Sequence, residues 1–253
     1  MNTVEIEKSS IRLDSKVAES CAAALKDKGW VFVPGQQWKN SFSLSLGQWS
    51  GFAAYWDNLM LDTHMGDNGR YRYRRYSSFQ VTPSTGQILP NPHEPYMQPK
   101  SVNPLNGDTK RYYSPLEQGL VTHPFFESLL LGLGQIYAQA SGKNEEWNVK
   151  LHPYRIRADQ SSPGMPTPEG LHRDGVDFIA MMLVDRVGVE GGVTTITDNN
   201  RSFLFSKTMT SPMDIILGDD HRVMHEVSAV NSPVLSGYRD ALVIAFARAT
   251  LHE

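Results

Sequence analysis

The tripeptide His172-Arg173-Asp174 places an imidazole and a carboxylate two positions apart. In extended chain, side chains at such positions project to the same side, so both could reach one metal ion. They would fill two corners of an octahedral face. The tripeptide alone is a weak signal, because short motifs also occur by chance. A solvated loop histidine beside a turn aspartate is then the simpler interpretation.

A second histidine downstream changes that balance. The segment 223–230 alternates and places His225 on the same face as apolar residues, so its imidazole is expected to point inward. A lone inward histidine is usually a core residue. His221 is a rival ligand, although it lies beside Asp219 and Asp220 in a predicted turn. With His225, the set becomes the 2-His-1-carboxylate triad that is typical of non-heme Fe(II) oxygenases.

Arg239 indicates what such a metal site would bind. This residue opens the last predicted strand, 239–247, on a face that is otherwise apolar. A fixed cation beside an apolar wall needs an anion. Arg239 follows His225 by fourteen residues, the length of one strand plus a turn, so it can lie on the neighbouring strand near the metal. A dicarboxylate with one end on the metal and the other on Arg239 would satisfy both groups.

Two further segments could contribute to a substrate site. The run 70–76 (RYRYRRY), taken as a strand, places Arg70, Arg72 and Arg74 on one face. Arginine forks suit a substrate carboxylate, because guanidinium binds it bidentately, but a solvated edge strand is an equally good interpretation. Residues 82–119 are rich in Pro, Asn and Gly. So long an irregular segment is unusual unless it covers a site, and it is either a lid or a packed surface loop.

The elements that must position these residues are mostly strands. From residue 147 onward the chain reads as short strands separated by turns, which is typical of a β sandwich or barrel. With metal ligands inside, the natural architecture is a double-stranded β-helix, a jelly roll of cupin type. The dipeptide His152-Pro153 interrupts the first of these strands, 148–158, and predicts a sheet edge or a bend there.

Helical patterns dominate the first half of the chain. A helix over 15–28 is delimited by Asp14 as N-cap and by Gly29. A second helix is predicted over 44–61, and a third begins with Thr122 as its cap. The predicted fold class is therefore α+β, mainly β, with the N-terminal helices packed on one sheet of the jelly roll.

Composition restricts the classes of protein to which the chain could belong. A length of 253 residues permits one large domain or two small ones. We expect a single domain over 1–253, with an N-terminal extension over 1–60 and a jelly-roll core over 147–247. A net charge of −3 argues against a dedicated nucleic-acid binder and against a polybasic membrane protein.

Cysteine usage and hydropathy indicate the compartment. Cys21 is the only cysteine, which excludes an internal disulfide and a thiolate metal cluster and fits a reducing environment. The first residues show no secretory pattern, and no apolar run approaches the roughly 20 residues of a transmembrane helix. We expect a cytoplasmic protein whose partner is a small molecule rather than nucleic acid or membrane.

Taken together, these motifs resemble those of the Fe(II)/2-oxoglutarate-dependent dioxygenases. More closely, the chain resembles the bacterial subfamily that hydroxylates free L-amino acids, of which isoleucine dioxygenase is the familiar member. The similar blocks lie between about residues 65 and 247 and are specific in combination. They read MGDNGRYRYRRYS, NPLNGDTKRYYSPL, LHRDGVDFIAMMLVDR, DDHRVMHEVSAV and GYRDALVIAF.

The resemblance assigns a role to each candidate residue. It implies that His172, Asp174 and His225 hold Fe(II), and that Arg239 binds the distal carboxylate of 2-oxoglutarate. It also implies that basic residues of the RYRYRRY block lie near the substrate. The substrate-binding candidates are Arg72, Arg74, Arg157, Arg173 and Asp177.

The implied reaction is hydroxylation of an unactivated C–H bond in a free aliphatic L-amino acid such as isoleucine, leucine or methionine. It would consume O₂ and 2-oxoglutarate and release succinate and CO₂. Related halogenases lack the carboxylate ligand, so Asp174 favours hydroxylation over halogenation.

Several alternatives remain at this point. The substrate could be an N-acylated amino acid or another small carboxylate. A cupin-type enzyme without 2-oxoglutarate would leave Arg239 unexplained. A jelly-roll binding module without activity would make the His and Asp residues structural. A nucleic-acid demethylase is disfavoured by the acidic charge balance.

Overall fold

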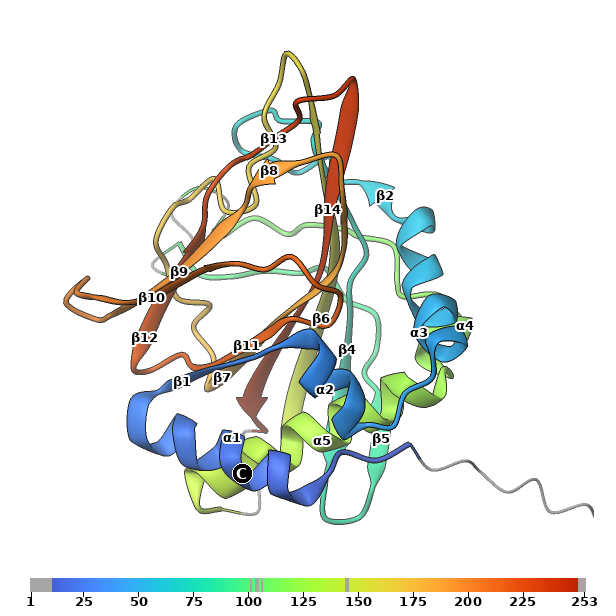
Figure 1. Cartoon of the computed structure of the whole chain (residues 1–253), viewed down its shortest axis with the longest axis vertical. Helices are drawn as coiled ribbons and strands as arrows, with labels where there is room; N and C mark the ends of the chain where they lie inside the picture. The colour runs from blue at the N-terminus through green and yellow to red at the C-terminus, as the bar shows by residue number, and fades with distance from the viewer. Residues whose placement is uncertain (1–10, 101, 103–104, 106, 144–145, 250–253) are drawn as a thin grey trace, which may run out of the picture.

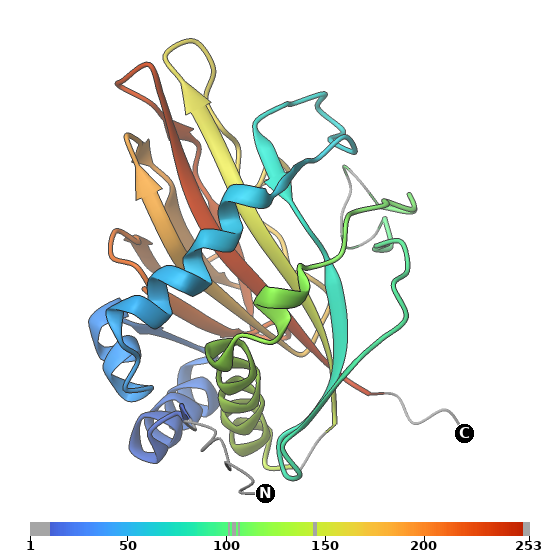
Figure 2. The ribbon, with the colours of Figure 1, turned by 90° about the vertical axis from the view of Figure 1, so that its right-hand side faces the viewer.

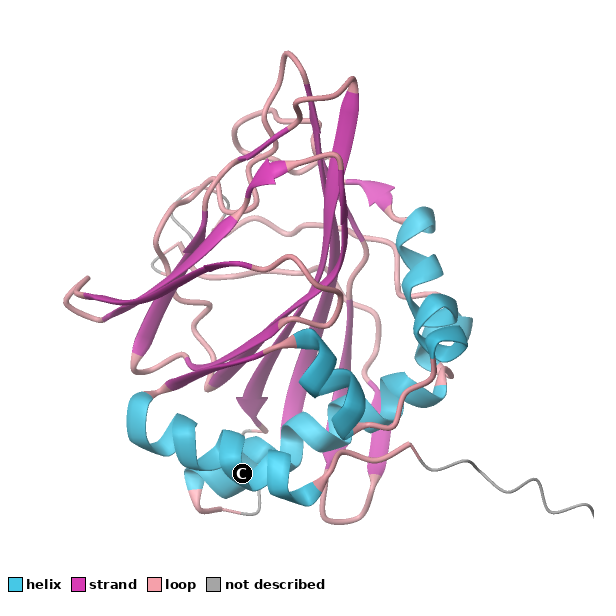
Figure 3. Ribbon diagram, viewed as in Figure 1, coloured by secondary structure: helices cyan, strands magenta, loops and turns pink. Residues whose placement is uncertain are grey.

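The structure is a computed structural model that describes residues 11–100, 102, 105, 107–143 and 146–249. Two β-sheets face each other, and helices cover the outer face of the larger sheet (Figure 1). Figure 3 shows the helices gathered on one side of the strands. This arrangement confirms the predicted mainly β fold with helices packed on one sheet of a jelly roll.

The larger sheet forms the backbone of the molecule. Within the described residues it contains nine antiparallel strands, in the order β1-β11-β7-β14-β6-β3-β2, with β4 also pairing with β6 and β5 with β4. The strands are β1 (Trp30–Val33), β2 (Met60–Leu61), β3 (Arg72–Arg74), β4 (Ser77–Thr82), β5 (Gln87–Pro90), β6 (Trp147–Asp159), β7 (Phe178–Val187), β11 (Ile215–Asp219) and β14 (Ser236–Arg248).

The smaller sheet closes the other side of the jelly roll. Its described strands are β10 (Phe203–Thr208), β9 (Val193–Asp198) and β12 (Val223–Val227), in that order, with all pairs antiparallel. Two short strands, β8 (Glu190–Gly191) and β13 (Val230–Asn231), pair nearby. Apolar side chains of both sheets, among them Met181 and Ile196, meet between the layers.

The helices are α1 (Ser15–Lys28), α2 (Gly35–Ser41), α3 (Leu46–Ala53), the 3₁₀ helix η1 (Ala54–Asn58), α4 (Gln118–Val121) and α5 (Pro124–Ser141). One hydrophobic core joins them to the outer face of the larger sheet, through residues such as Leu25, Phe52 and Leu133. Figure 2 shows α3 and η1 running across that face. In the part of the chain that the structure describes, no helix is both long and apolar enough to cross a membrane.

Helix termini follow local chemistry. Asp14 accepts hydrogen bonds from two backbone N–H groups of α1, and Gly29, at φ 81°, ends that helix as predicted. The single helix predicted over 44–61 is wrong. A capping box at Ser45 starts α3, which changes to η1 at Ala54 and is followed by β2.

The structure also differs from the predicted helices at α2 and at the start of α5. The helix α2 was not predicted, and the cap of α5 is His123 rather than Thr122, with Pro124 at the first helical position. In η1, the indole N–H of Trp56 lies 3.2 Å from the carbonyl oxygens of both Tyr154 and Ala241, to which it donates. These contacts hold η1 against the sheet.

The strand β6 is neither an edge nor a bend, so that prediction is wrong. It runs unbroken for 13 residues and pairs with β14 along its whole length. On the opposite side, β3 pairs with 154–156 and β4 with 147–151, which leaves His152 and Pro153 unpaired there. A proline without an N–H group is tolerated at this gap between two partner strands.

Candidate active site

A cavity of about 190 Å³ lies between the two sheets. Its walls come from β3, β6, β12 and β14, from the loop that precedes β7, and from the segment between β5 and α4. The inward-facing residues of β6 that line it are Lys150, His152, Tyr154 and Ile156. Alternation along one strand therefore places three polar side chains in the cavity.

His172, Asp174 and His225 meet at this cavity, and their potential ligand atoms all lie within 4.8 Å of one another. Nε2 of His172 is 3.8 Å from Oδ1 of Asp174, and Nε2 of His225 is 3.9 Å from Oδ2. His172 and His225 exchange two backbone hydrogen bonds of 3.0 and 2.9 Å. This bridge attaches the loop before β7 to β12 and brings the three side chains together.

Both histidines can offer a ring nitrogen to a metal ion. Nδ1 of His172 lies 2.8 Å from the carbonyl oxygen of Gly170, to which it donates, so Nε2 keeps a lone pair directed at the cavity. Burial, and then the neighbouring His172, lowers the pKa of His225 to about 3, which keeps that imidazole neutral. Two imidazoles and one carboxylate are the donor set of a divalent iron site.

Asp220 holds the backbone of the ligand loop. Its carboxylate accepts hydrogen bonds from the N–H groups of Asp174, Gly175 and Val176, at 3.0, 2.7 and 3.0 Å. Asp220 is buried. Sequence analysis placed it only in a turn, because its partners lie 44 to 46 positions away.

Arg239 lines the same cavity and is 4% exposed. Its Nε has no hydrogen-bond partner among the described residues. Burial, and then the nearby Arg186, lowers its pKa to about 10, so the side chain is still a cation at neutral pH. The adjacent Asp240 does not neutralise it, because that carboxylate binds Arg155 at 2.7 Å. A buried, unpartnered guanidinium fits the distal carboxylate of 2-oxoglutarate.

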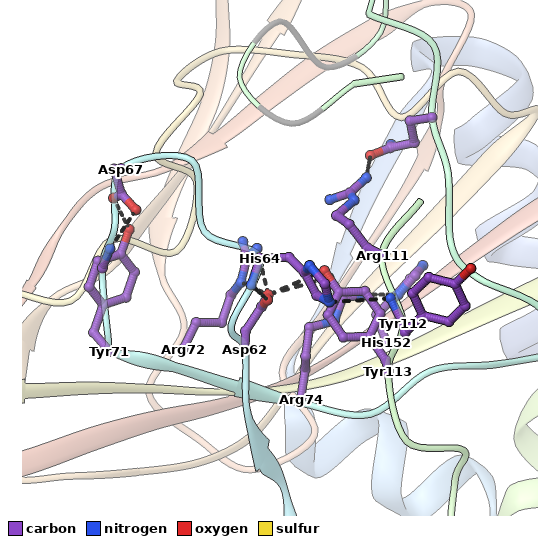
Figure 4. Close-up of polar contacts among 12 residues, drawn as sticks. Asp62, His64, Asp67, Tyr71, Arg72, Arg74, Arg111, Tyr112, Tyr113 and His152 are labelled. Carbon is purple, nitrogen blue, oxygen red and sulfur yellow. Dashed lines mark hydrogen bonds and ion pairs between the residues drawn. The ribbon is translucent and has the colours of Figure 1, made fainter. Parts of the chain in front are cut away.

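Arg72 and Arg74 line the cavity from β3, but both are already engaged (Figure 4). Nη2 of Arg72 lies 2.8 Å from Oδ2 of Asp62, in a buried ion pair. Arg74 donates to Nδ1 of His152, and its guanidinium lies 3.9 Å from the ring centroid of Tyr113. Burial and then the surrounding cations lower the pKa of His152, so it stays neutral and can accept this hydrogen bond.

Three substrate candidates lie outside the cavity. Arg157 is exposed on the opposite face of β6, where its guanidinium stacks 5.0 Å from the ring centroid of Tyr73. Arg173 is also exposed. Asp177 pairs with Nη1 of Arg248 at 2.7 Å on the outer surface. The structure does not bring these three residues to the metal-ligand cluster.

His221 also lies away from the cluster. Its side chain is exposed and its Nε2 is 3.2 Å from Oδ1 of Asp177. The geometry therefore selects His225 over His221 as the histidine beside Asp174.

Part of the segment 82–119 does form a wall of the cavity. Tyr96, Gln98 and Arg111 line it, and Arg111 donates to Gln98 at 3.1 Å. Residues 101, 103, 104 and 106 of the predicted lid lie outside the described residues. Closure of this segment on a substrate stays a prediction.

Three charged residues of the cavity were not identified from the sequence. They are Lys150, Arg111 and Glu169. Lys150 shares an inward face with His152, so the alternation of β6 could have identified it once the inner face was known. Arg111 and Glu169 stand in irregular segments, where no periodicity indicates the direction of a side chain.

Comparisons with known proteins agree with this geometry. A family model described as 2OG-Fe dioxygenase matches residues 53–245. The protein is 25% identical over 238 residues to 3(1)-hydroxy-L-isoleucine 4-dioxygenase of Pantoea ananatis (strain AJ13355), which covers 89% of this chain and 94% of that protein.

Two solved structures extend the comparison. A bsmA homologue from Methylobium petroleophilum PM1 is 31% identical, with a TM-score of 0.83 over 97% of this chain and 96% of that chain. IDO from Bacillus thuringiensis is 16% identical, with a TM-score of 0.73 over 91% of this chain and 95% of that one. The second likeness concerns the fold alone.

Proposed function

This chain belongs to the 2OG-Fe dioxygenase family, and we propose that it hydroxylates an unactivated C–H bond of a free aliphatic L-amino acid. As a member of that family it is an enzyme that uses Fe(II), 2-oxoglutarate and O₂. The candidate substrates resemble isoleucine, leucine or methionine. The relative named 3(1)-hydroxy-L-isoleucine 4-dioxygenase supports the amino-acid class.

In this proposal His172, Asp174 and His225 hold the iron, and Arg239 binds the distal carboxylate of 2-oxoglutarate. When bound, iron and 2-oxoglutarate supply, with O₂, the oxidising power for hydroxylation, and succinate and CO₂ are released. The observation that carries the proposal is that the three ligand residues and the unpartnered Arg239 open into one cavity.

The protein itself positions the reactants and excludes water. Lys150 and Arg111 are cations of the cavity wall that can bind a substrate carboxylate. Met97, Val102 and Val176 give the same cavity an apolar part that suits an aliphatic side chain.

The test is succinate release from anaerobically prepared Fe(II) protein that then receives 2-oxoglutarate, O₂ and each of the twenty L-amino acids in turn. We expect strong stimulation by one or a few aliphatic amino acids. Turnover of 2-oxoglutarate that no amino acid stimulates would contradict the substrate class and favour N-acylated amino acids or other small carboxylates. Protein that neither retains iron nor turns over would contradict the assigned metal centre.

The first variant to compare is Asp174→Ala. Loss of the only carboxylate of the triad should abolish both stoichiometric iron binding and substrate-stimulated succinate release, because two imidazoles alone do not retain the ion. The control is Asp27→Ala, which removes an exposed carboxylate at the end of α1. Iron content and succinate are the measurements, and circular dichroism verifies folding. Retained iron-dependent turnover in Asp174→Ala would overturn the assignment.

A further inference from the structure

We propose that Glu169 binds the ammonium group of the substrate and so selects free amino acids over N-acylated ones, an inference that rests on the proposed function. Glu169 lies in the loop that leads to His172 and lines the cavity. Its side chain is only 12% exposed. Its Oε2 is buried and has no hydrogen-bond partner among the described residues.

Glu169 does not serve to orient His172. A carboxylate that supports a metal-binding histidine accepts from the ring nitrogen that faces away from the metal. That nitrogen of His172, Nδ1, already donates to Gly170. Oε1 of Glu169 instead lies 3.7 Å from Nε2, the nitrogen directed at the cavity. A separation of 3.7 Å is longer than a hydrogen bond, so His172 is not a hydrogen-bond donor to Glu169.

No lysine or arginine of the cavity wall forms an ion pair with Glu169 among the described residues. Arg72 is paired with Asp62 and Arg74 donates to His152, whereas Lys150, Arg111 and Arg239 line the cavity without an ion pair to Glu169 in the described part of the chain. A buried carboxylate that lacks both a donor and a cation is costly. The carboxylate of Glu169 is therefore suited to bind a cationic group of a ligand.

An α-ammonium group provides what is missing, since it carries a positive charge and three N–H donors. The acidic residues that line the described cavity are Asp174 and Glu169, and Asp174 is already a member of the metal-ligand cluster. Glu169 is thus the acid left for a cationic ligand group. An N-acylated substrate would bring a neutral amide with a single donor. The proximity of Glu169 to His172 places the amino end of the substrate on the His172 side of the metal centre.

The test measures binding without turnover. Calorimetry under anaerobic conditions, on protein loaded with Fe(II) and 2-oxoglutarate, gives Kd for the amino acid found by the succinate screen and for its 2-hydroxy-acid analogue. The wild type should bind the amino acid at least tenfold more tightly. Glu169→Gln should weaken amino-acid binding about 10- to 100-fold, the factor expected for a lost charge-assisted hydrogen bond, and leave the hydroxy acid within about twofold.

Two further variants complete the set. Glu169→Asp keeps the charge and should retain part of the discrimination. Glu190→Gln removes an exposed carboxylate on β8 and should change nothing. Iron content and the Kd of 2-oxoglutarate should be the same in all variants.

The outcomes separate this inference from the proposed function. If no free amino acid stimulates the wild type, the proposed function and the role of Glu169 both fail. If one does, but Glu169→Gln weakens both ligands equally or lowers iron content, Glu169 supports the metal centre and only this inference fails. Unchanged binding of the amino acid in Glu169→Gln would also overturn it.

Discussion

Arg239 is a buried cation that the described protein does not neutralise. Its Nε lacks a partner and its charged neighbour Arg186 disfavours the protonated form. The backbone at Gly192 packs closely against it, since a Cβ there would lie 3.2 Å from Cδ of Arg239. A side chain at position 192 would therefore crowd Arg239. At the scale of a single residue, this buried cation is the strongest requirement for an anionic ligand.

Replacement of Arg239 by lysine should impair cosubstrate binding. Lysine keeps the charge but loses the planar fork that binds a carboxylate bidentately. We expect Arg239→Lys to raise KM for 2-oxoglutarate about 10- to 100-fold, with iron content unchanged, measured as succinate release at varied 2-oxoglutarate. Arg201→Lys, at an exposed turn, is the matched control. An unchanged KM in Arg239→Lys would place the cosubstrate elsewhere.

At the scale of elements, the metal-ligand cluster depends on a loop held by two neighbours. The backbone bridge between His172 and His225 attaches this loop to β12. Asp220, after the end of β11, binds three consecutive N–H groups at its other end. Gly175, the middle one of these three residues, permits the turn there, because its φ of 74° is rarely adopted by other residues. The loop has no regular structure, so these contacts determine where Asp174 points.

Asp220→Asn should therefore weaken metal binding without touching a ligand. An amide directs N–H donors toward at least one backbone N–H that now donates to a carboxylate oxygen. We expect iron affinity to fall about 10- to 100-fold, the usual effect of losing a group that orients metal ligands. Anaerobic Fe(II) titration is the measurement. Asp219→Asn is the control, since among the described residues its carboxylate accepts a hydrogen bond from the backbone N–H of His221 and not from the ligand loop. Equal affinity in both variants would contradict a positioning role for Asp220.

At the scale of the whole molecule, the two faces of the larger sheet have different tasks. Its outer face packs against α1, α3 and α5 in one hydrophobic core. Its inner face presents Lys150, His152 and Arg239 to the cavity. The core holds β6 and β14 in fixed register along 13 residue pairs, so polar groups on the inner face keep their mutual positions. Stability and chemistry are thus built on opposite sides of the same strands.

Fe(II) and 2-oxoglutarate would bind between the two sheets, so they should stabilise the whole fold. A ligand present at about 100 times its Kd adds roughly 2.7 kcal/mol to the free energy of unfolding. For a chain of this size that corresponds to a rise in Tm of about 5–10 °C. We expect this shift when Fe(II) and 2-oxoglutarate are added anaerobically to the apoprotein, measured by scanning calorimetry. Chelation of the iron should reverse it, and Asp174→Ala should show no shift. A wild type that shows none would contradict a joint site for both ligands.

Local patterns in the sequence were sufficient to predict several elements of the fold and the direction of one metal-ligand candidate. Alternation over 223–230 correctly predicted that the side chain of His225 points inward. The N-cap Asp14 and the C-terminal Gly29 correctly predicted the ends of α1. Strand spacing predicted the jelly roll. These features depend on contacts between residues a few positions apart, and such contacts have the same geometry in every fold.

Only the tertiary structure decided which polar residues share the cavity. The pairing of β6 with its neighbours turned Lys150 inward and Arg157 outward, whereas the sequence had suggested Arg157 as one of several substrate-binding candidates and had not pointed to Lys150. Asp220 and Glu169 lie outside regular strands, where no periodicity indicates the direction of a side chain. Only the folded chain shows that Asp220 binds the ligand loop and that Glu169 lines the cavity. The physical reason is that a strand's alternation places side chains on two faces, but pairing and packing with distant segments determine which face encloses the site.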